Sequence, residues 1–412
     1  ERAPDSRAQL ITMRESRDAV VKTSERAGRV PPSETLAITA RAKELKQQGI
    51  DVVSFGAGEP DFGTPDHIGD AAKAAIDAGE TRYTSGISEL KEAIVAAVER
   101  DMGLKYEVTN VCCSIGAKHA LHTLCQCICD PGDEIIIFAP YWVSYPPMIG
   151  MADGVTKIVN TTGENGFVPD VADVEAQVTD KTAAIVINSP SNPTGAVFSR
   201  DAMQGLADVA VRHDLLIVSD ECYDKIVFDG LTATSPATLG DAVRERTLVV
   251  NSASKTYAMT GWRVGWTVGP EDIIKAMGAY QSHETSNPCS IAEMAAAAGL
   301  LGDQDFVEHM RQAFEERRDY VVQRCDAIDG VTLPRPQGAF YAFPDVSSHY
   351  GRTLNGREVT DSASLIQYLL EDANVAAVPG APFGADAHIR ISFATSMEQL
   401  EKGFDRIEAA LK

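Results

Sequence analysis

Four side chains with chemically useful groups each follow a short apolar run within a few positions. They are an amide, a carboxylate, a phenol and an amine: Asn192, Asp220, Tyr223 and Lys255. If the runs form neighbouring strands of an open parallel sheet, the four groups lie together, because ligands bind beyond the carboxyl ends of such strands. A lysine amine that is partly desolvated among cationic groups can exchange protons near neutral pH. The sequence therefore predicts a site for binding and proton transfer at this edge.

The elements that must position these groups are those of an α/β fold. Short apolar runs alternate with helical stretches, at 134–138, 183–187, 215–219 and 247–250. Polar, Gly or Pro turns bound each run, which is typical of a mostly parallel sheet covered by helices. We expect this sheet to form a large domain over residues 62–309.

A second, smaller α+β domain is expected from the two flanking parts of the chain, 24–61 and 310–412. The first part contains the strand-like run 51–55, and the second begins within a long charged helix at 305–327. Further strand candidates lie at 331–333, 339–343 and 388–393. Residues 1–23 are polar and lack apolar periodicity, so we interpret them as an N-terminal tail or extension.

A turn of small residues at Gly116 and Ala117 follows a short strand-like run and opens a helix. The free N–H groups of a helix N-terminus, together with the helix dipole, favour a phosphate. By itself this turn does not identify a ligand.

Four segments carry a family resemblance. Residues 252–263 read Ser-Ala-Ser-Lys-Thr-Tyr-Ala-Met-Thr-Gly-Trp-Arg and resemble the lysine signature of class I aminotransferases. The segments 58–62, 139–145 and 189–195 resemble further motifs of this family, in the family's order. The similarity covers about residues 30–412 and is greatest to the bacterial and plant-plastid branch of aspartate aminotransferases, which includes enzymes that transaminate prephenate. It implies a two-domain, homodimeric fold type I enzyme that uses pyridoxal 5′-phosphate.

The resemblance assigns the chemical roles around the cofactor ring. Lys255 would hold the cofactor as a Schiff base and then shuttle the substrate's α-proton. Asp220 would pair with the ring nitrogen, and Tyr223 and Asn192 would hydrogen-bond the 3′-oxygen. Trp142 would stack on the ring. The ordinary alternatives are a solvated lysine, a helix cap at the aspartate, and packing or turn roles for the others.

The resemblance also assigns a phosphate site. Arg263, Ser252 and the backbone of Gly116 and Ala117 would hold the phosphate, with the guanidinium matching two oxygens at once. Tyr83 would reach the phosphate of the neighbouring subunit, so that the homodimer shares its active sites. Buried packing for the tyrosine and a surface salt bridge for the arginine are the alternatives.

The substrate would be bound by groups from both ends of the chain. Arg390 matches the family's arginine for the α-carboxylate, with the Gly58 backbone, Asn192 and Trp142 nearby. Lys118 would meet a distal carboxylate or the cofactor phosphate. Thr84 together with Lys118 resembles the pair seen in prephenate-accepting members.

The predicted reaction is transfer of the amino group of aspartate or glutamate to a 2-oxo acid by a ping-pong mechanism. The acceptors are 2-oxoglutarate or oxaloacetate, with prephenate as a further hypothesis. The sequence departs from the family at two segments that lie, in the family, beside the entrance of the substrate site. Pro31-Pro32-Ser33 replaces a common Lys-Pro-Ser, and the segment Thr84-Ser85-Gly86 is about two residues shorter than usual. An aromatic or kynurenine-type aminotransferase, or a lyase on the same fold, stays open.

Several other classes are disfavoured by the sequence. A formal charge of −22 opposes nucleic acid as a partner, and no basic helix-turn-helix supports a DNA-binding regulator. The glycines of 56–58 lack the third glycine of a nicotinamide site. No run approaches the roughly 20 apolar residues of a membrane helix, which suggests a cytoplasmic enzyme, with an organelle such as a plastid as the alternative. His119, His122 and Cys125 have helical spacing, but we interpret them as packing and expect no metal.

Overall fold

The computed structural model describes residues 24–30, 34–84 and 86–412. The chain divides into two compact units, Glu1–Pro32 and Ser33–Lys412. In the first unit the structure describes a four-residue helix, α2 (Glu25–Gly28). The expected tail at 1–23 and the departure at Pro31-Pro32-Ser33 lie outside the described residues, as does Ser85.

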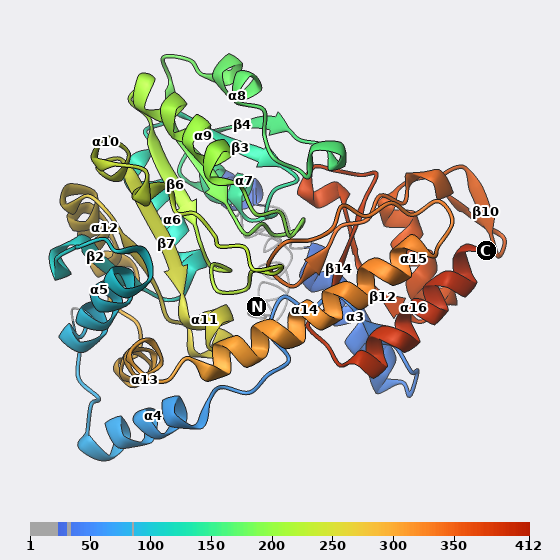
Figure 1. The fold of residues 1–412 in the computed structure, drawn as a ribbon, viewed down its shortest axis with the longest axis horizontal. Coiled ribbons are helices and arrows are strands. Elements are labelled where there is room, and N and C mark those ends of the chain that lie inside the picture. Colours follow the sequence, from blue (N-terminus) through green and yellow to red (C-terminus); the bar gives the residue numbers. More distant parts are fainter. Residues whose placement is uncertain (1–23, 31–33, 85) are drawn as a thin grey trace, which may run out of the picture. The chain divides into compact units, whose positions relative to one another are not determined.

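A seven-stranded sheet forms the centre of the second unit, with the strand order β2-β8-β7-β6-β5-β3-β4 (Figure 1). Every neighbouring pair is parallel except the two pairs that involve β8. The expectation of a mostly parallel α/β sheet is therefore confirmed. The strands are β2 (Val111–Ser114), β3 (Glu134–Ala139), β4 (Val155–Asn160), β5 (Thr182–Asn188), β6 (Leu216–Asp220), β7 (Thr247–Ser252) and β8 (Gly265–Val268).

Helices cover both faces of this sheet, which explains the unbroken apolar runs of its central strands. Along β3, Ile135 and Ile137 pack in one apolar cluster with α6 and α12, whereas Ile136 and Phe138 pack in another with α9. The helices of this part are α4 (Asp66–Ala78), α5 (Ser88–Met102), α6 (Ala117–Ile128), α7 (Tyr145–Met151), α8 (Val171–Gln177), α9 (Arg200–Arg212), α10 (Asp241–Arg244), α11 (Ala253–Thr256), α12 (Glu271–Glu284) and α13 (Ser290–Leu301).

The rest of this unit is called the C-terminal part here, although α3 and β1 precede the central sheet in the sequence. It combines small sheets with four helices, α3 (Glu34–Gln47), α14 (Asp305–Asp326), α15 (Ser362–Asp372) and α16 (Met397–Leu411). Strand β1 (Val53–Ser54) pairs in parallel with β12 (Val375–Ala376), and β10 (Arg352–Leu354) forms a hairpin with β11 (Arg357–Val359). A three-stranded antiparallel sheet has the order β13 (Val378–Pro379), β14 (Ile389–Ser392), β9 (Tyr341–Ala342). The expected strand at 331–333 is wrong: Thr332 makes an isolated bridge to Asp345.

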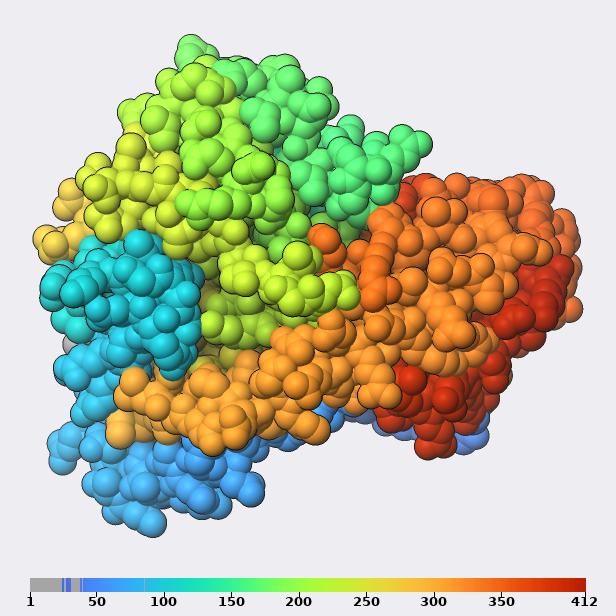
Figure 2. Space-filling view, viewed as in Figure 1, coloured from blue at the N-terminus to red at the C-terminus, as the bar shows by residue number. Residues whose placement is uncertain are grey.

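Helix α14 links the two parts of this unit, and Figure 2 shows it in orange along one face as far as the red C-terminal segment. Val307, near its start, belongs to the apolar cluster of α4, α5 and α13. Met310, Phe314 and Val321 belong to the cluster of the C-terminal part. The expected division into a large and a small domain stays a prediction, because Ser33–Lys412 forms one compact unit by its contacts.

Six short 3₁₀ segments complete the described elements: η1 (Val108–Asn110), η2 (Gly163–Asn165), η3 (Pro236–Thr238), η4 (Thr260–Trp262), η5 (Ser347–His349) and η6 (Ala381–Phe383). Among the described helices, none has the length and the apolar character that a membrane crossing requires.

Candidate active site

The carboxyl ends of β5, β6 and β7 bring the predicted groups together. The Asn188 side chain donates to the Asp220 carbonyl at 3.1 Å and accepts from the backbone N–H of Asn192 at 2.9 Å. The Asn192 side-chain oxygen in turn accepts from Arg390 on β14 at 3.1 Å. One hydrogen-bonded chain therefore joins two central strands to the C-terminal sheet.

Lys255 lies on α11, one turn beyond β7. Its ammonium donates a hydrogen bond to the carbonyl oxygen of Gly58. Burial lowers the pKa of Lys255 to about 8, and Arg390 and Arg263 act in the same direction, against Cys222 and Glu59. A substantial fraction of this amine is therefore neutral near physiological pH, as a nucleophile and base must be.

Asp220 ends β6 and is buried. Its Oδ2 accepts from the hydroxyl of Tyr145 at 2.7 Å, and its Oδ1 accepts from the Cys222 backbone N–H at 3.3 Å. Burial raises the pKa of Asp220, whereas both hydrogen bonds lower it. A cationic group placed against this carboxylate would compensate its burial, which fits a protonated ring nitrogen. Sequence reasoning missed Tyr145, although it lies inside the motif 139–145.

Arg390 is a fully buried guanidinium with no ion pair among the described residues. Nη1 donates to Asn192 and Nη2 donates to the Gly56 carbonyl at 3.2 Å, while Nε finds no acceptor in the described part of the chain. The rings of Tyr341 and Phe383 lie 4.5 and 5.3 Å from its central carbon. Burial lowers its pKa. A buried cation without a carboxylate is costly, so this site fits an anionic ligand.

Tyr223 follows β6 and is also buried. Its hydroxyl lies 3.0 Å from the hydroxyl of Tyr341 on β9, a residue that sequence reasoning missed. Burial raises the pKa of both tyrosines, so both side chains stay protonated donors. The only sequence signal for Tyr341 was its place in the strand candidate 339–343.

The predicted phosphate site is a close contact between the start of α6, η4 and β8. Arg263 donates to the Ile115 carbonyl at 3.2 Å and to the Thr260 carbonyl at 2.7 Å. A Cβ added at Gly116, which has a φ of +79°, would lie 2.4 Å from the Arg263 guanidinium. Ser252 is buried at the end of β7. A guanidinium thus lies beside a helix N-terminus, which fits a phosphate ligand.

Lys118 and Trp142 face each other, with the ammonium 5.0 Å from the ring centroid. Burial and then Arg263 lower the pKa of Lys118. The Trp142 ring packs edge-on against Tyr145, at 5.4 Å and 83°. Lys118, Trp142 and the Asp220 region therefore form a continuous set of contacts.

Tyr83 and Thr84 lie on the loop between α4 and α5. Thr84 donates its hydroxyl to Glu293 at 3.2 Å and accepts from Asn287 through its carbonyl at 2.6 Å, so it contacts α13 and the segment before it. The Tyr83 side chain is 97% exposed, so the alternative of buried packing is wrong for a single chain. Within the described residues, no hydrogen bond or ion pair joins Tyr83 or Thr84 to Lys118 or Arg390.

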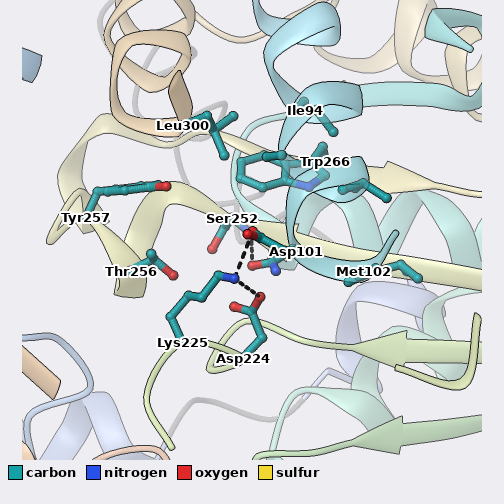
Figure 3. Close-up of a pocket in the computed structure, with 14 residues that line it drawn as sticks. Ile94, Asp101, Met102, Asp224, Lys225, Ser252, Thr256, Tyr257, Trp266 and Leu300 are labelled. Carbon is teal, nitrogen blue, oxygen red and sulfur yellow. Dashed lines mark hydrogen bonds and ion pairs between the residues drawn. The ribbon is translucent and has the colours of Figure 1, made fainter. Parts of the chain in front are cut away.

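Ser252 also lines a second pocket, which Figure 3 shows. Lys225 lies there between two carboxylates, 2.8 Å from Asp101 and 4.0 Å from Asp224. Apolar side chains from α5, β8 and α13 form its other walls. This pocket shares Ser252 with the predicted site, but neither Lys255 nor Arg390 lines it.

The histidines of α6 contact a carboxylate on α12. Nε2 of His119 and Nε2 of His122 lie 3.1 and 3.4 Å from the two oxygens of Glu284, and Cys125 is buried. Across the part of the chain that the structure describes, no group of three potential ligands is arranged to hold a metal ion.

Comparison with known proteins identifies the family. The family described as aminotransferase class I and II matches residues 50–407. The chain is 47% identical over 390 residues to the aspartate/prephenate aminotransferase of Cereibacter sphaeroides, covering 94% of this chain and 98% of that protein. It is 46% identical over 389 residues to the aspartate aminotransferase of Geobacillus stearothermophilus, with the same coverage.

Solved structures agree in fold. The aspartate aminotransferase of Rhizobium meliloti superposes with a TM-score of 0.92 at 41% identity, covering 95% of this chain and 98% of that one. The Thermus thermophilus aspartate aminotransferase with maleate gives a TM-score of 0.89 at 42% identity, covering 94% and 99%. The fold and the resemblance expected from the sequence are confirmed, and this chain belongs to the class I and II aminotransferase family.

Proposed function

We propose that this protein is a pyridoxal-phosphate-dependent aminotransferase that moves the amino group of aspartate or glutamate to a 2-oxo acid. One observation carries the proposal. A lysine with a lowered pKa lies at the carboxyl edge of the sheet, among a buried carboxylate, a buried phenol and a buried arginine that pairs with no carboxylate of the described residues. The names of the relatives support the same reaction.

The residues present fit the cofactor. Pyridoxal phosphate, when bound, supplies an aldehyde that reacts with amines and a ring that withdraws electrons from the substrate's α-carbon. Asp220 would hold a positive charge at the ring nitrogen, and Tyr223 and Asn192 would donate to the 3′-oxygen. Trp142 offers a flat apolar face to the ring.

The phosphate and the second subunit complete the proposed site. Arg263, Ser252 and the first turn of α6, at Gly116 and Ala117, would hold the phosphate. We propose a homodimer in which the exposed Tyr83 reaches the phosphate of the partner's site. The solvent-exposed position of this tyrosine supports that role, because its side chain is free to contact a second subunit.

Two cations would bind a dicarboxylic substrate. Arg390 would take the α-carboxylate, because its guanidinium is buried and uncompensated, with the Gly58 backbone nearby. Lys118 would bind the distal carboxylate. Lys255 would remove the proton from the substrate's α-carbon and pass it to the cofactor. Because the amino group stays on the enzyme between substrates, the kinetics are ping-pong.

We further propose prephenate as an amino acceptor. Thr84 and Lys118 together resemble the pair of prephenate-accepting members, and a relative is named for that substrate. A direct assay with prephenate and aspartate decides this point, and no product would reject it without affecting aspartate chemistry.

The first test is a half-reaction spectrum of the purified holoenzyme with single amino acids. We expect aspartate and glutamate to convert the cofactor to its amine form and alanine to do so poorly. Lys118→Ala should raise the KM of aspartate about 10- to 100-fold, the range for a lost charged hydrogen bond, and leave alanine unchanged.

Lys105→Ala is the matched control, because Lys105 is a surface lysine with an 84% exposed side chain. Pyruvate or ammonia released without an acceptor would favour a lyase, and tyrosine or kynurenine as the fastest donor would favour the aromatic alternatives. Intersecting initial-rate lines would contradict the ping-pong mechanism.

A further inference from the structure

Tyr341 contacts two of the proposed site groups and lies close to a third. It is 1% exposed, and its position on β9 pairs with Ser392, two residues after Arg390 on β14. Its hydroxyl lies 3.0 Å from that of Tyr223, and its ring lies 4.5 Å from the Arg390 guanidinium carbon. A Cβ built on Gly58, the residue whose carbonyl accepts from Lys255, would lie 3.7 Å from the Tyr341 hydroxyl.

We propose that Tyr341 is a positioning residue that couples the carboxylate-binding Arg390 to the hydrogen-bond donor Tyr223. This inference rests on the proposed function, since it concerns how two of its groups are held. Its role is to act through these two side chains.

The first half of the proposal, called the hydroxyl arm here, is the hydrogen bond from Tyr341 to Tyr223. Its direction follows from the number of hydroxyl protons. Tyr223 has one hydroxyl proton, which it would donate to the 3′-oxygen of the cofactor, so its own oxygen accepts from Tyr341. The Tyr341 hydroxyl has no other hydrogen-bond partner in the part of the chain that the structure describes. Because hydrogen bonds in a chain polarise one another, the proton from Tyr341 makes Tyr223 a stronger donor.

The second half, called the ring arm here, is the contact of the Tyr341 ring with Arg390. It concerns the orientation of the guanidinium plane. Arg390 lies against the rings of Tyr341 and Phe383, while two of its nitrogens donate to Asn192 and Gly56. An aromatic face attracts a desolvated cation strongly. The Tyr341 ring therefore fixes the orientation in which Arg390 presents itself to a carboxylate.

A purely structural role makes a different prediction. Tyr341 also packs against Phe340, with ring centroids 4.7 Å apart, and against Tyr223 at 5.8 Å. If packing were its whole role, Tyr341→Phe would keep every ring contact and leave the site unchanged. The hydroxyl and the ring can therefore be tested separately.

The experiment measures the visible absorbance of bound pyridoxal phosphate against pH, together with the KM and kcat for aspartate. Tyr341→Phe removes only the hydroxyl. We expect the midpoint of the absorbance change to rise by about half to one pH unit, because a weaker donor leaves the 3′-oxygen more basic. The KM for aspartate should stay within about twofold, because the ring remains.

Tyr341→Leu removes both arms. We expect the same rise in the midpoint and, in addition, an increase of about tenfold in the KM for aspartate with a smaller change in kcat. The double variant Tyr223→Phe/Tyr341→Phe should have the midpoint of Tyr223→Phe alone, because Tyr341 acts through Tyr223.

Tyr368→Phe is the matched control. Tyr368 is a buried tyrosine of α15 whose hydroxyl donates to the Ala410 carbonyl at 3.0 Å, and its loss should move neither readout. Circular dichroism and thermal unfolding report whether each variant folds, and the isosteric Tyr341→Phe decides the hydroxyl arm if Tyr341→Leu does not fold.

An unchanged midpoint in Tyr341→Phe overturns the coupling, as does a shift that persists additively in the double variant. An unchanged KM in a folded Tyr341→Leu overturns the ring arm. The wild-type protein separates these results from failure of the proposed function: if it shows no cofactor absorbance and no half-reaction, the function itself is wrong.

Discussion

Lys255 illustrates how burial sets the chemistry of a single side chain. An ordinary lysine is almost fully charged at neutral pH and is a poor nucleophile. Here burial lowers its pKa to about 8, and two nearby guanidiniums act in the same direction. The amine that the family match assigns to catalysis is thus also the one that the structure makes reactive.

The pH dependence of cofactor attachment tests this property. The neutral amine attacks the aldehyde, so the rate at which the apoprotein binds pyridoxal phosphate covalently should rise with pH through about 8 and then level off. Arg390→Met should move this midpoint upward, because it removes a positive charge that opposes protonation. Stopped-flow absorbance gives the rates.

Arg357→Met is the control for this experiment, since Arg357 is 43% exposed and pairs with carboxylates on α15. A midpoint near that of an ordinary lysine, in wild type and variant alike, would contradict the effect of burial.

The element that most constrains the phosphate site is β8, whose first residue lies against the start of α6. A Cβ added at Gly265 would lie 2.5 Å from the backbone nitrogen of Ala117 and from the carbonyl carbon of Gly116. Both are backbone atoms, so the strand and the helix would have to separate. This close approach keeps Arg263 and the first turn of α6 in one site.

Gly265→Ala should therefore lower the free energy of unfolding by about 1–3 kcal/mol, as overpacking does, and also weaken pyridoxal phosphate binding. Gly69→Ala is the matched control, because Gly69 lies in α4 and an added Cβ would meet open space. That change should stabilise the protein by about 0.5–1 kcal/mol and leave binding unchanged. Urea unfolding and cofactor titration measure the two effects. Equal stabilities of the two variants would contradict the close-packing explanation.

At the scale of the whole molecule, two buried carboxyls link stability to pH. Burial raises the pKa of Glu221 and of Glu293 to about 7, although hydroxyls of Ser235, Ser219 and Thr84 donate to them. One oxygen of Glu293 accepts no hydrogen bond from the residues that the structure describes. Each native carboxyl therefore keeps a proton that the unfolded chain releases near its model value of 4.5.

The sign follows from proton binding. Between pH 4.5 and about 7 the native state holds more protons than the unfolded state, so the contribution of each group is fully present below 4.5 and is lost as pH rises through 7. Glu293→Gln should consequently be more stable than wild type at pH 8, by up to about 3 kcal/mol, and nearly equal to it at pH 4.5.

Urea unfolding of both proteins across this range isolates the effect, because all other groups cancel in the difference. Glu99→Gln, at a 53% exposed side chain, is the control and should show no such trend. Parallel stability curves for Glu293→Gln and wild type would show that Glu293 titrates normally.

Much of the fold and site could be predicted from sequence because the signals were local. Strands β3, β5, β6 and β7 are buried on both faces and therefore read as continuous apolar runs. The edge strand β4 is half exposed and β8 has four residues, so neither gave such a signal. The run 331–333 was apolar enough to suggest a strand, but only one bridge pairs it.

The sequence by itself determined the family. It also pointed to Lys255, Asp220, Tyr223 and Arg390 as proposed site residues, because each lies in a continuous motif or shortly after a predicted strand. Only the tertiary structure decided which groups touch. The Tyr145–Asp220 and Tyr223–Tyr341 contacts join residues 75 and 118 positions apart, and the Arg390–Asn192 contact joins residues 198 apart. Such contacts, and the burial that shifts the pKa values of Lys255 and Glu293, depend on how distant segments pack, which no local pattern of residues specifies.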